Sequence, residues 1–241
     1  AHLGVRPNMN ARQTAAEVVV VDYGLGNLRS VTRGLERAGA GVTLTSDPDE
    51  FAAADGIVLP GVGAFSEGMD NAGPFRDALE AEAESGTPLF GICLGMQMLL
   101  TTSEEADHEG QGDAEGLDLI PGENVRFSRD QTVPHMGWNE LDVTRAHPLV
   151  EGVDSVGAET PRADGTGGSV DGEHAYFVHS YYAVPEDAPA GGATTDYGTH
   201  FAAIVANEAG NVLGAQVYPQ KTREAGLRVL RDNVDYCIDQ R

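Results

Sequence analysis

The fold is decided by the stretch Pro-Leu-Phe-Gly-Ile-Cys-Leu-Gly-Met-Gln-Met-Leu-Leu at residues 88–100, which contains the pattern Gly-x-Cys-x-Gly around Cys93. An apolar strand that enters a sharp turn with a nucleophile at its tip, and leaves as an apolar helix, has this form. The two glycines allow strained backbone and close packing of strand and helix. A helix that begins beside the sulfur stabilises the thiolate. We therefore expect the Cys93 sulfur to be presented as a nucleophile rather than buried. The alternative, a core cysteine, does not require both glycines.

The composition limits the classes of partner and compartment. The chain has 241 residues, with 38 acidic and 15 basic side chains, a formal net charge of −23 and a single lysine, Lys221. This balance argues against a nucleic-acid partner and is typical of a protein that must stay soluble in concentrated salt. The only cysteines are Cys93 and Cys237. They provide no disulfide framework, which favours a reducing cytoplasm.

We expect neither a membrane-spanning helix nor a secretion signal in this sequence. No apolar run approaches the roughly 18 residues of a membrane-spanning helix, so we expect no membrane association. Residues 1–16 lack the charged and then apolar pattern of a secretion signal, and we interpret them as a loose leader in which Met9 could be the true start. We expect residues 17–241 to form a single domain.

Short apolar strands alternate with amphipathic helices in the first half of the chain. Strands are predicted at residues 18–22, 42–45, 56–59 and 89–92, and helices at residues 27–38 and 74–84. This alternation predicts a parallel sheet covered on both faces by helices.

Beyond Glu123 the pattern changes to strand followed by strand. Strands are predicted at residues 176–184, 201–206 and 212–217, with a hairpin turn at 208–211 and a closing helix at 223–238. The acidic, glycine-containing stretches 102–116 and 157–174 are predicted to be surface loops. We therefore expect an α/β fold whose C-terminal strands are antiparallel.

Two glycine-containing motifs follow predicted strands. Residues 60–65, Pro-Gly-Val-Gly-Ala-Phe, can turn backbone N–H groups toward an anion, although a tight turn without a ligand is the alternative. A cysteine hydrolase uses such donors, with the N–H after the nucleophile, here Leu94, to hold an oxyanion. Residues 23–27, Tyr-Gly-Leu-Gly-Asn, lack the third glycine of a dinucleotide loop, because Arg29 occupies that position. We expect no nucleotide cofactor and no metal.

Five motifs together resemble the glutaminase subunits of imidazole glycerol phosphate synthase, which are class I (triad) glutamine amidotransferases of histidine biosynthesis. They are Tyr-Gly-Leu-Gly-Asn at 23–27, Leu-Pro-Gly-Val-Gly-Ala-Phe at 59–65, Gly-Ile-Cys-Leu-Gly-Met-Gln at 91–97, Pro-His-Met-Gly-Trp-Asn at 134–139 and Tyr-Phe-Val-His-Ser-Tyr at 176–181. The likeness extends from residue 18 to about residue 235, and the last two motifs point to this subunit. It implies a three-layer, flavodoxin-like amidotransferase domain whose sheet is mainly parallel.

The resemblance implies a reaction and a set of site residues. Cys93 would attack the carboxamide of glutamine, giving a glutamyl thioester and ammonia, and water would then release glutamate. The oxyanion donors would be Gly61, Val62, Gly63 and Leu94. The residues that hold the amino-acid end of glutamine would be Gln97, His179, Ser180 and Tyr181.

The resemblance also implies a protein partner. The ammonia would pass into a (β/α)8-barrel cyclase subunit, so that the working enzyme is a heterodimer. The positions that match the interface with that subunit are Asn27, Trp138, Asn139, Tyr176 and Lys221. Trp138 and Tyr176 could alternatively be aromatic residues of the core.

The chain departs from the family at two catalytic positions. Family members end the last core strand with Phe-His-Pro-Glu-Lys, in which the histidine is the base and the glutamate orients it. Residues 217–221 here read Val-Tyr-Pro-Gln-Lys, so Tyr218 and Gln220 occupy those positions. A tyrosine is a poor proton acceptor at neutral pH, and a glutamine carries no charge to stabilise an imidazolium. Neither residue is expected to be competent.

We expect no other histidine to take over as the base. His179 matches a substrate position, His135 lies in the interface motif, and His200 begins a strand far from the end of the next one. Two hypotheses remain. The chain is either a glutaminase subunit with impaired hydrolysis or a pseudoenzyme that binds and stabilises the cyclase. A generic cysteine hydrolase would not explain the interface motifs.

Overall fold

The computed structural model describes residues 15–106, 112–144, 147–150, 174–186, 191–219 and 223–241. The expectations for the leader at residues 1–16 and for a loop at 157–174 fall almost entirely outside these residues. So do Gln220 and Lys221.

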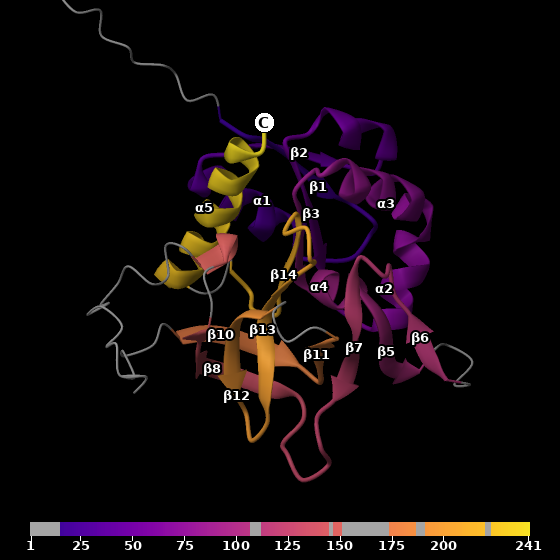
Figure 1. Ribbon diagram of the computed structural model, residues 1–241, viewed down its shortest axis with the longest axis vertical. Helices are drawn as coiled ribbons and strands as arrows, with labels where there is room; N and C mark the ends of the chain where they lie inside the picture. The colour runs from indigo at the N-terminus through magenta and orange to yellow at the C-terminus, as the bar shows by residue number, and fades with distance from the viewer. Residues whose placement is uncertain (1–14, 107–111, 145–146, 151–173, 187–190, 220–222) are drawn as a thin grey trace, which may run out of the picture.

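The first half alternates strands and helices. Its elements are β1 (Glu17–Val21), α1 (Leu28–Ala38), β2 (Gly41–Thr45), η1 (Pro48–Ala53), β3 (Gly56–Gly61), α2 (Phe65–Ala72), η2 (Gly73–Phe75), α3 (Arg76–Ser85) and β4 (Leu89–Cys93). The strands pair in the order β2-β1-β3-β4, and every pair is parallel. Figure 1 shows α1 on one side of these strands and α2 and α3 on the other. The predicted parallel sheet is confirmed.

Helix α1 illustrates how local sequence sets an element's ends. The Asn27 side chain accepts a hydrogen bond from the Ser30 N–H at the start of the helix. Gly39 ends it in the left-handed region, at φ 108°. The helix therefore occupies the predicted span, and its apolar face packs against the sheet.

The second half consists mainly of strands. Its elements are α4 (Leu94–Met98), β5 (Leu100–Ala106), β6 (Asp113–Glu115), β7 (Ile120–Arg126), β8 (His135–Glu140), β9 (Asp142–Val143), η3 (Pro148–Val150), β10 (His174–His179), β11 (Tyr181–Pro185), β12 (Gly191–Asp196), β13 (His200–Ala206), β14 (Val212–Ala215) and α5 (Arg223–Asp239). Strand β14 is parallel to β4 and antiparallel to β13, so the predicted hairpin turn is confirmed. The large sheet thus joins a parallel half to a mainly antiparallel half, as expected.

Two predictions about the second half are wrong. Residues 102–116 are not only a loop, because β5 pairs with both β6 and β7 despite its acidic composition. Residues 176–184 are not one strand, because the chain changes sheets at Ser180. Strand β10 pairs with β8 in a separate two-stranded sheet, whereas β11 pairs with β7 and β13 in the large one. Tertiary pairing overrides local strand preference in both segments.

The core lies on both faces of the parallel sheet. Val18 and Val20 of β1 belong to one buried cluster, whereas Val19 and Val21 belong to the other. Because successive side chains of a strand point to opposite faces, this division places a core on each side. The carboxyl ends of β3 and β4 are held between these cores, and the candidate site forms there.

Candidate active site around Cys93

Cys93 ends β4 in a backbone conformation that non-glycine residues rarely adopt, with φ 56° and ψ −111°. The flanking glycines are required by close packing. A Cβ atom at Gly91 would lie 2.7 Å from the Met96 nitrogen, and one at Gly95 would overlap the Leu59 carbonyl oxygen. The helix that follows, α4, has only five residues. The geometry is that of the elbow predicted from the sequence.

The prediction that the sulfur would be presented rather than buried is wrong in one respect. The Cys93 residue is only 5% exposed. It nevertheless lines a cavity of about 270 Å³ together with Val62, Gly63, Leu94, Gln97, Glu105, Pro134, Val178, His179, Ser180, Tyr181 and Tyr218. The covering strands β10 and β11, which lie far along the chain, could not be anticipated at the elbow itself. The sulfur therefore faces a cavity that a small molecule could occupy.

The loop after β3 lies directly beside the elbow. Gly61 pairs with Cys93 across the two strands, and a Cβ atom there would lie 2.6 Å from the Gly95 nitrogen. The Tyr23 hydroxyl donates to the Pro60 carbonyl at 2.6 Å, and a Glu105 carboxylate oxygen accepts from the Phe65 N–H at 2.9 Å. These two contacts fix both ends of the 61–64 loop against the thiol.

Two side chains donate hydrogen bonds to the Cys93 sulfur. The Gln216 amide nitrogen lies 3.6 Å from it, and the Tyr218 phenol also bonds to it. Burial, followed by the proximity and hydrogen bond of Cys93, raises the pKa of Tyr218. The phenol therefore keeps its proton and acts as a donor, not as a base.

The ring of His179 is committed to the protein. Its Nδ1 lies 2.8 Å from the Tyr181 carbonyl oxygen, and its Nε2 lies 3.1 Å from Nδ1 of His135. Because a carbonyl only accepts, Nδ1 carries the proton and Nε2 accepts from His135. Burial lowers the pKa of His179 to about 3. A neutral ring with both nitrogens occupied is in no position to deprotonate Cys93.

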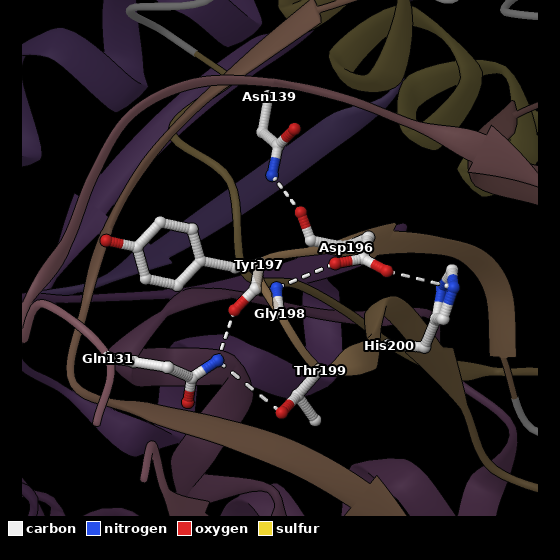
Figure 2. Close-up of polar contacts among 7 residues, drawn as sticks. All are labelled: Gln131, Asn139, Asp196, Tyr197, Gly198, Thr199 and His200. Carbon is white, nitrogen blue, oxygen red and sulfur yellow. Dashed lines mark hydrogen bonds and ion pairs between the residues drawn. The ribbon is translucent and has the colours of Figure 1, made fainter. Parts of the chain in front are cut away.

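Several predicted partner-facing residues gather on the two-stranded sheet. Trp138 is 50% exposed, and its ring centroid lies 5.6 Å from that of Tyr176, so it is not a core aromatic. Asn139 donates to the Asp196 carbonyl at 2.6 Å, in the polar network of the β12–β13 turn (Figure 2). Asn27 is distant in sequence and caps α1.

His200 lies in the same network and away from the cavity. Its Nε2 is 3.0 Å from an Asp196 carboxylate oxygen, and both side chains are exposed (Figure 2). This placement agrees with the expectation that His200 does not replace the missing base.

Two residues beside the Cys93 sulfur or its cavity, Gln216 and Glu105, were not predicted as site residues from the sequence. Gln216 is fully buried and directly follows β14, where a polar residue in an otherwise apolar run was the available signal. Glu105 lay within a stretch interpreted as a loop, and only its pairing as part of β5 brings it to the cavity. Within the described residues, no group of three or more histidine, cysteine or acidic side chains could hold a metal ion. None of the described helices has the length and apolar character needed to cross a membrane.

The model of the family "Glutamine amidotransferase class-I" matches residues 19–236. The subunit HisH of imidazole glycerol phosphate synthase from Haloarcula marismortui is 83% identical over 231 residues, which cover 96% of this chain and all of the relative. The chain belongs to the HisH family of class-I glutamine amidotransferases.

Another HisH subunit, from Natronomonas pharaonis, is 66% identical over 232 residues, covering 96% of this chain and all of that protein. The fold is also that of a chain in the structure of PurLQS from Thermotoga maritima, with a TM-score of 0.65 at 21% identity, covering 92% of this chain and 99% of that one. This member of the HisH family therefore has a tyrosine, Tyr218, hydrogen-bonded to the cysteine of its elbow.

Proposed function

We propose that this chain is the glutaminase subunit that delivers ammonia to the cyclase subunit of imidazole glycerol phosphate synthase, and that its own glutamine hydrolysis is slow. The observation that carries the proposal is the position of the Cys93 sulfur. It lies at a strained elbow, beside the 61–63 loop, in a cavity large enough for a small amino acid.

The retained residues would perform the first half of the reaction. Cys93 would attack the carboxamide carbon of glutamine, while N–H groups of the 61–63 loop and of Leu94 would hold the developing oxyanion. Gln97, Ser180 and Tyr181 border the same cavity and would position the amino-acid end of glutamine. The ring nitrogens of His179 are already bonded within the protein, so His179 would contribute shape and backbone groups.

Proton transfer would limit the rate. The departing ammonia needs an acid, and a sulfur that still carries its proton needs a base, a double role that one histidine plays in related triads. Tyr218 keeps its proton, because burial and Cys93 raise its pKa, and it directs that proton at the sulfur. Removing the histidine of a comparable hydrolytic triad costs roughly 10⁶-fold in turnover, and we expect a loss of at least about 10³-fold here.

The partner proposal rests on the exposed aromatic pair of β8 and β10. Trp138 and Tyr176 are opposite each other in the register of these strands, and Trp138 and Met136 are the large apolar side chains exposed there. Exposed aromatic residues of this kind commonly anchor protein interfaces. The cyclase subunit is the partner that this surface would bind.

A second candidate is a non-catalytic subunit that binds and stabilises the cyclase. The hydrogen bond from Tyr218 to Cys93 favours it, because it fills the position from which a base would act.

Glutamate release in the presence of the cyclase subunit and its nucleotide substrate distinguishes the two candidates. The proposal expects slow release that the partner stimulates and that Cys93→Ala abolishes. Tight binding of the partner without any Cys93-dependent release would instead establish the non-catalytic subunit. Failure to bind the cyclase at all would overturn both.

A further inference from the structure

We propose that Gln216 is a catalytic residue of this site that holds Cys93 as a thiolate, and that Gln97 is the positioning residue that fixes the direction of the Gln216 amide. The inference rests on the proposed function only in taking Cys93 as the nucleophile. It assigns the activation of the sulfur to hydrogen-bond donors instead of a base.

An unbroken chain of hydrogen bonds leads from a backbone carbonyl to the sulfur. The Gln97 amide nitrogen lies 3.0 Å from the Tyr181 carbonyl oxygen and 2.9 Å from Oε1 of Gln216. The Gln216 amide nitrogen then lies 3.6 Å from the Cys93 sulfur. All three side chains are at least nine-tenths buried, so these contacts are shielded from water.

The Tyr181 carbonyl oxygen, the first acceptor, determines the direction of every hydrogen bond in this series. A backbone carbonyl only accepts, so the Gln97 atom that faces Tyr181 must be its NH₂ group. The second hydrogen of that group points at Gln216, which must therefore present its oxygen. This leaves the Gln216 NH₂ group facing the sulfur. The reversed orientation would set the Gln97 oxygen against the Tyr181 carbonyl oxygen, and neither of these two atoms can donate.

The Gln97 end of the chain is itself anchored. The Asn124 side chain donates to the Gln97 carbonyl at 2.9 Å and to the Thr102 carbonyl at 3.1 Å. Asn124 is fully buried on β7. Hydrogen bonds among Asn124, Gln97 and Gln216 thus connect β7, α4 and the end of β14. This series of amides is held at both ends.

Donors directed at a sulfur favour its charged form over the thiol. Gln216 provides one donor and Tyr218 another. Among the described residues that line the cavity there is no lysine or arginine, and the one carboxylate is Glu105. Within the described lining of the cavity, the groups available to stabilise the thiolate are thus hydrogen-bond donors.

Three buried or partly buried tyrosines and His179 near the sulfur stay in one protonation state near neutral pH. Burial raises the pKa of Tyr23, Tyr181 and Tyr218 and keeps them protonated, with Glu105 adding to the effect at Tyr181. Burial lowers the pKa of His179 to about 3, which keeps its ring neutral. A titration between about pH 5 and pH 9 therefore does not report these tyrosines or His179.

Alkylation by iodoacetamide reports the fraction of Cys93 that is a thiolate. The sulfur forms its bond to carbon as iodide leaves, and no protein base or acid takes part. Cys93 is followed by mass spectrometry of its peptide. Burial raises the pKa of Cys237, the other cysteine, to about 12, so it serves as an internal reference that stays a thiol. The measured quantity is the midpoint pH of the Cys93 alkylation rate in the full chain.

We expect Gln216→Met to raise the midpoint by about one pH unit, which makes alkylation at low pH about 10-fold slower. Gln216→Glu, which turns the group facing the sulfur into an oxygen, should raise it further. Gln97→Met frees the Gln216 amide to rotate and should raise it in the same direction. Asn233→Asp makes the same amide-to-acid change at a buried position on α5 and should leave the midpoint unchanged.

Unchanged midpoints in folded Gln216→Met and Gln97→Met variants would overturn the proposal. So would a Cys93 in the unmodified chain that fails to react across the whole pH range. Should the acidic variant not fold, as judged by thermal melting, the two methionine variants decide the question. Because alkylation requires neither glutamine nor the partner, its outcome is independent of the glutaminase assay.

Discussion

The backbone N–H of Tyr218 donates a hydrogen bond of 3.3 Å to the carbonyl oxygen of Tyr176. Tyr176 lies on β10, directly opposite the exposed Trp138 of β8. The residue that occupies the expected base position is therefore joined through the main chain to the strand that we propose as the docking surface. A partner that shifted β10 would move Tyr218 relative to Cys93. This connection gives the proposed stimulation by the cyclase a physical route.

Trp138→Ala should weaken binding of the cyclase subunit. An exposed tryptophan at the centre of an interface commonly contributes more than about 1 kcal/mol, so we expect the dissociation constant to rise at least about 5-fold. Isothermal titration calorimetry measures this dissociation constant. The matched control is Leu44→Ala, because Leu44 is exposed to a similar extent, 46% against 50%, but lies on the edge strand β2. If the unmodified chain, Trp138→Ala and Leu44→Ala all bound the cyclase with equal affinity, the proposal that β8 and β10 form the docking surface would be wrong.

Gly95→Ala should strongly destabilise the fold. Its Cβ atom would overlap the Leu59 carbonyl oxygen, and forcing atoms into packed backbone typically costs about 1–3 kcal/mol or more. Thermal melting or urea unfolding measures the loss.

Gly73→Ala is the matched control for that substitution. Gly73 is in the helical region at φ −47°, and its Cβ would meet nothing within 4 Å. We expect it to be neutral or slightly stabilising, because alanine restricts the unfolded chain. If Gly95→Ala were as stable as Gly73→Ala, the close packing of β3 against the elbow would be refuted.

The buried His179 should make the protein sensitive to acid. Its folded pKa of about 3 lies below the ordinary value of 6.5, so the unfolded chain binds more protons between these limits. Stability is then fully present above about pH 6.5 and falls as the pH is lowered, by up to about 1.4 kcal/mol per pH unit from this residue. Urea midpoints measured at several pH values report the slope.

Replacing His179 isolates its contribution to the pH dependence of stability. His179→Gln should flatten the slope, and His200→Gln, a change of the same kind at an exposed position, is the control. An unchanged slope in His179→Gln would show that other groups cause the acid sensitivity.

The net charge of −23 should make stability depend on salt. Repulsion among acidic side chains opposes the compact state, and added salt screens it. We expect the melting temperature to rise steadily between about 0.1 M and about 2 M potassium chloride. A melting temperature that is constant or falls over this range would contradict the interpretation of the acidic composition.

The sequence predicts best those parts of the fold that depend on neighbouring residues. The strands before Cys93 are apolar runs bounded by glycines, α1 carries its own cap at Asn27, and the turn at 208–211 joins strands that pair directly. The elbow is predictable for the same reason, because both glycines lie within two residues of the nucleophile. Each of these features is decided within a short window of sequence.

The missed features depend on contacts between distant segments. The change of sheets at Ser180 follows from the pairing of β10 with β8 and of β11 with β7. The covering of Cys93 and the arrival of Glu105 depend on the same strands. Gln216 could be recognised as an unusual buried polar residue, but its side chain is hydrogen-bonded to Gln97, more than a hundred residues earlier.

We propose that the residues at positions 218 and 220 limit the turnover of an otherwise complete glutaminase site. The most direct measurement is the turnover number for glutamate release by the complex with the cyclase, compared between the unmodified chain and a Tyr218→His, Gln220→Glu double variant. We predict that the double variant is faster by at least about 10³-fold and that a further Cys93→Ala substitution abolishes the gain. An unmodified chain that already matches the double variant, and that loses its activity on Cys93→Ala alone, would contradict the account.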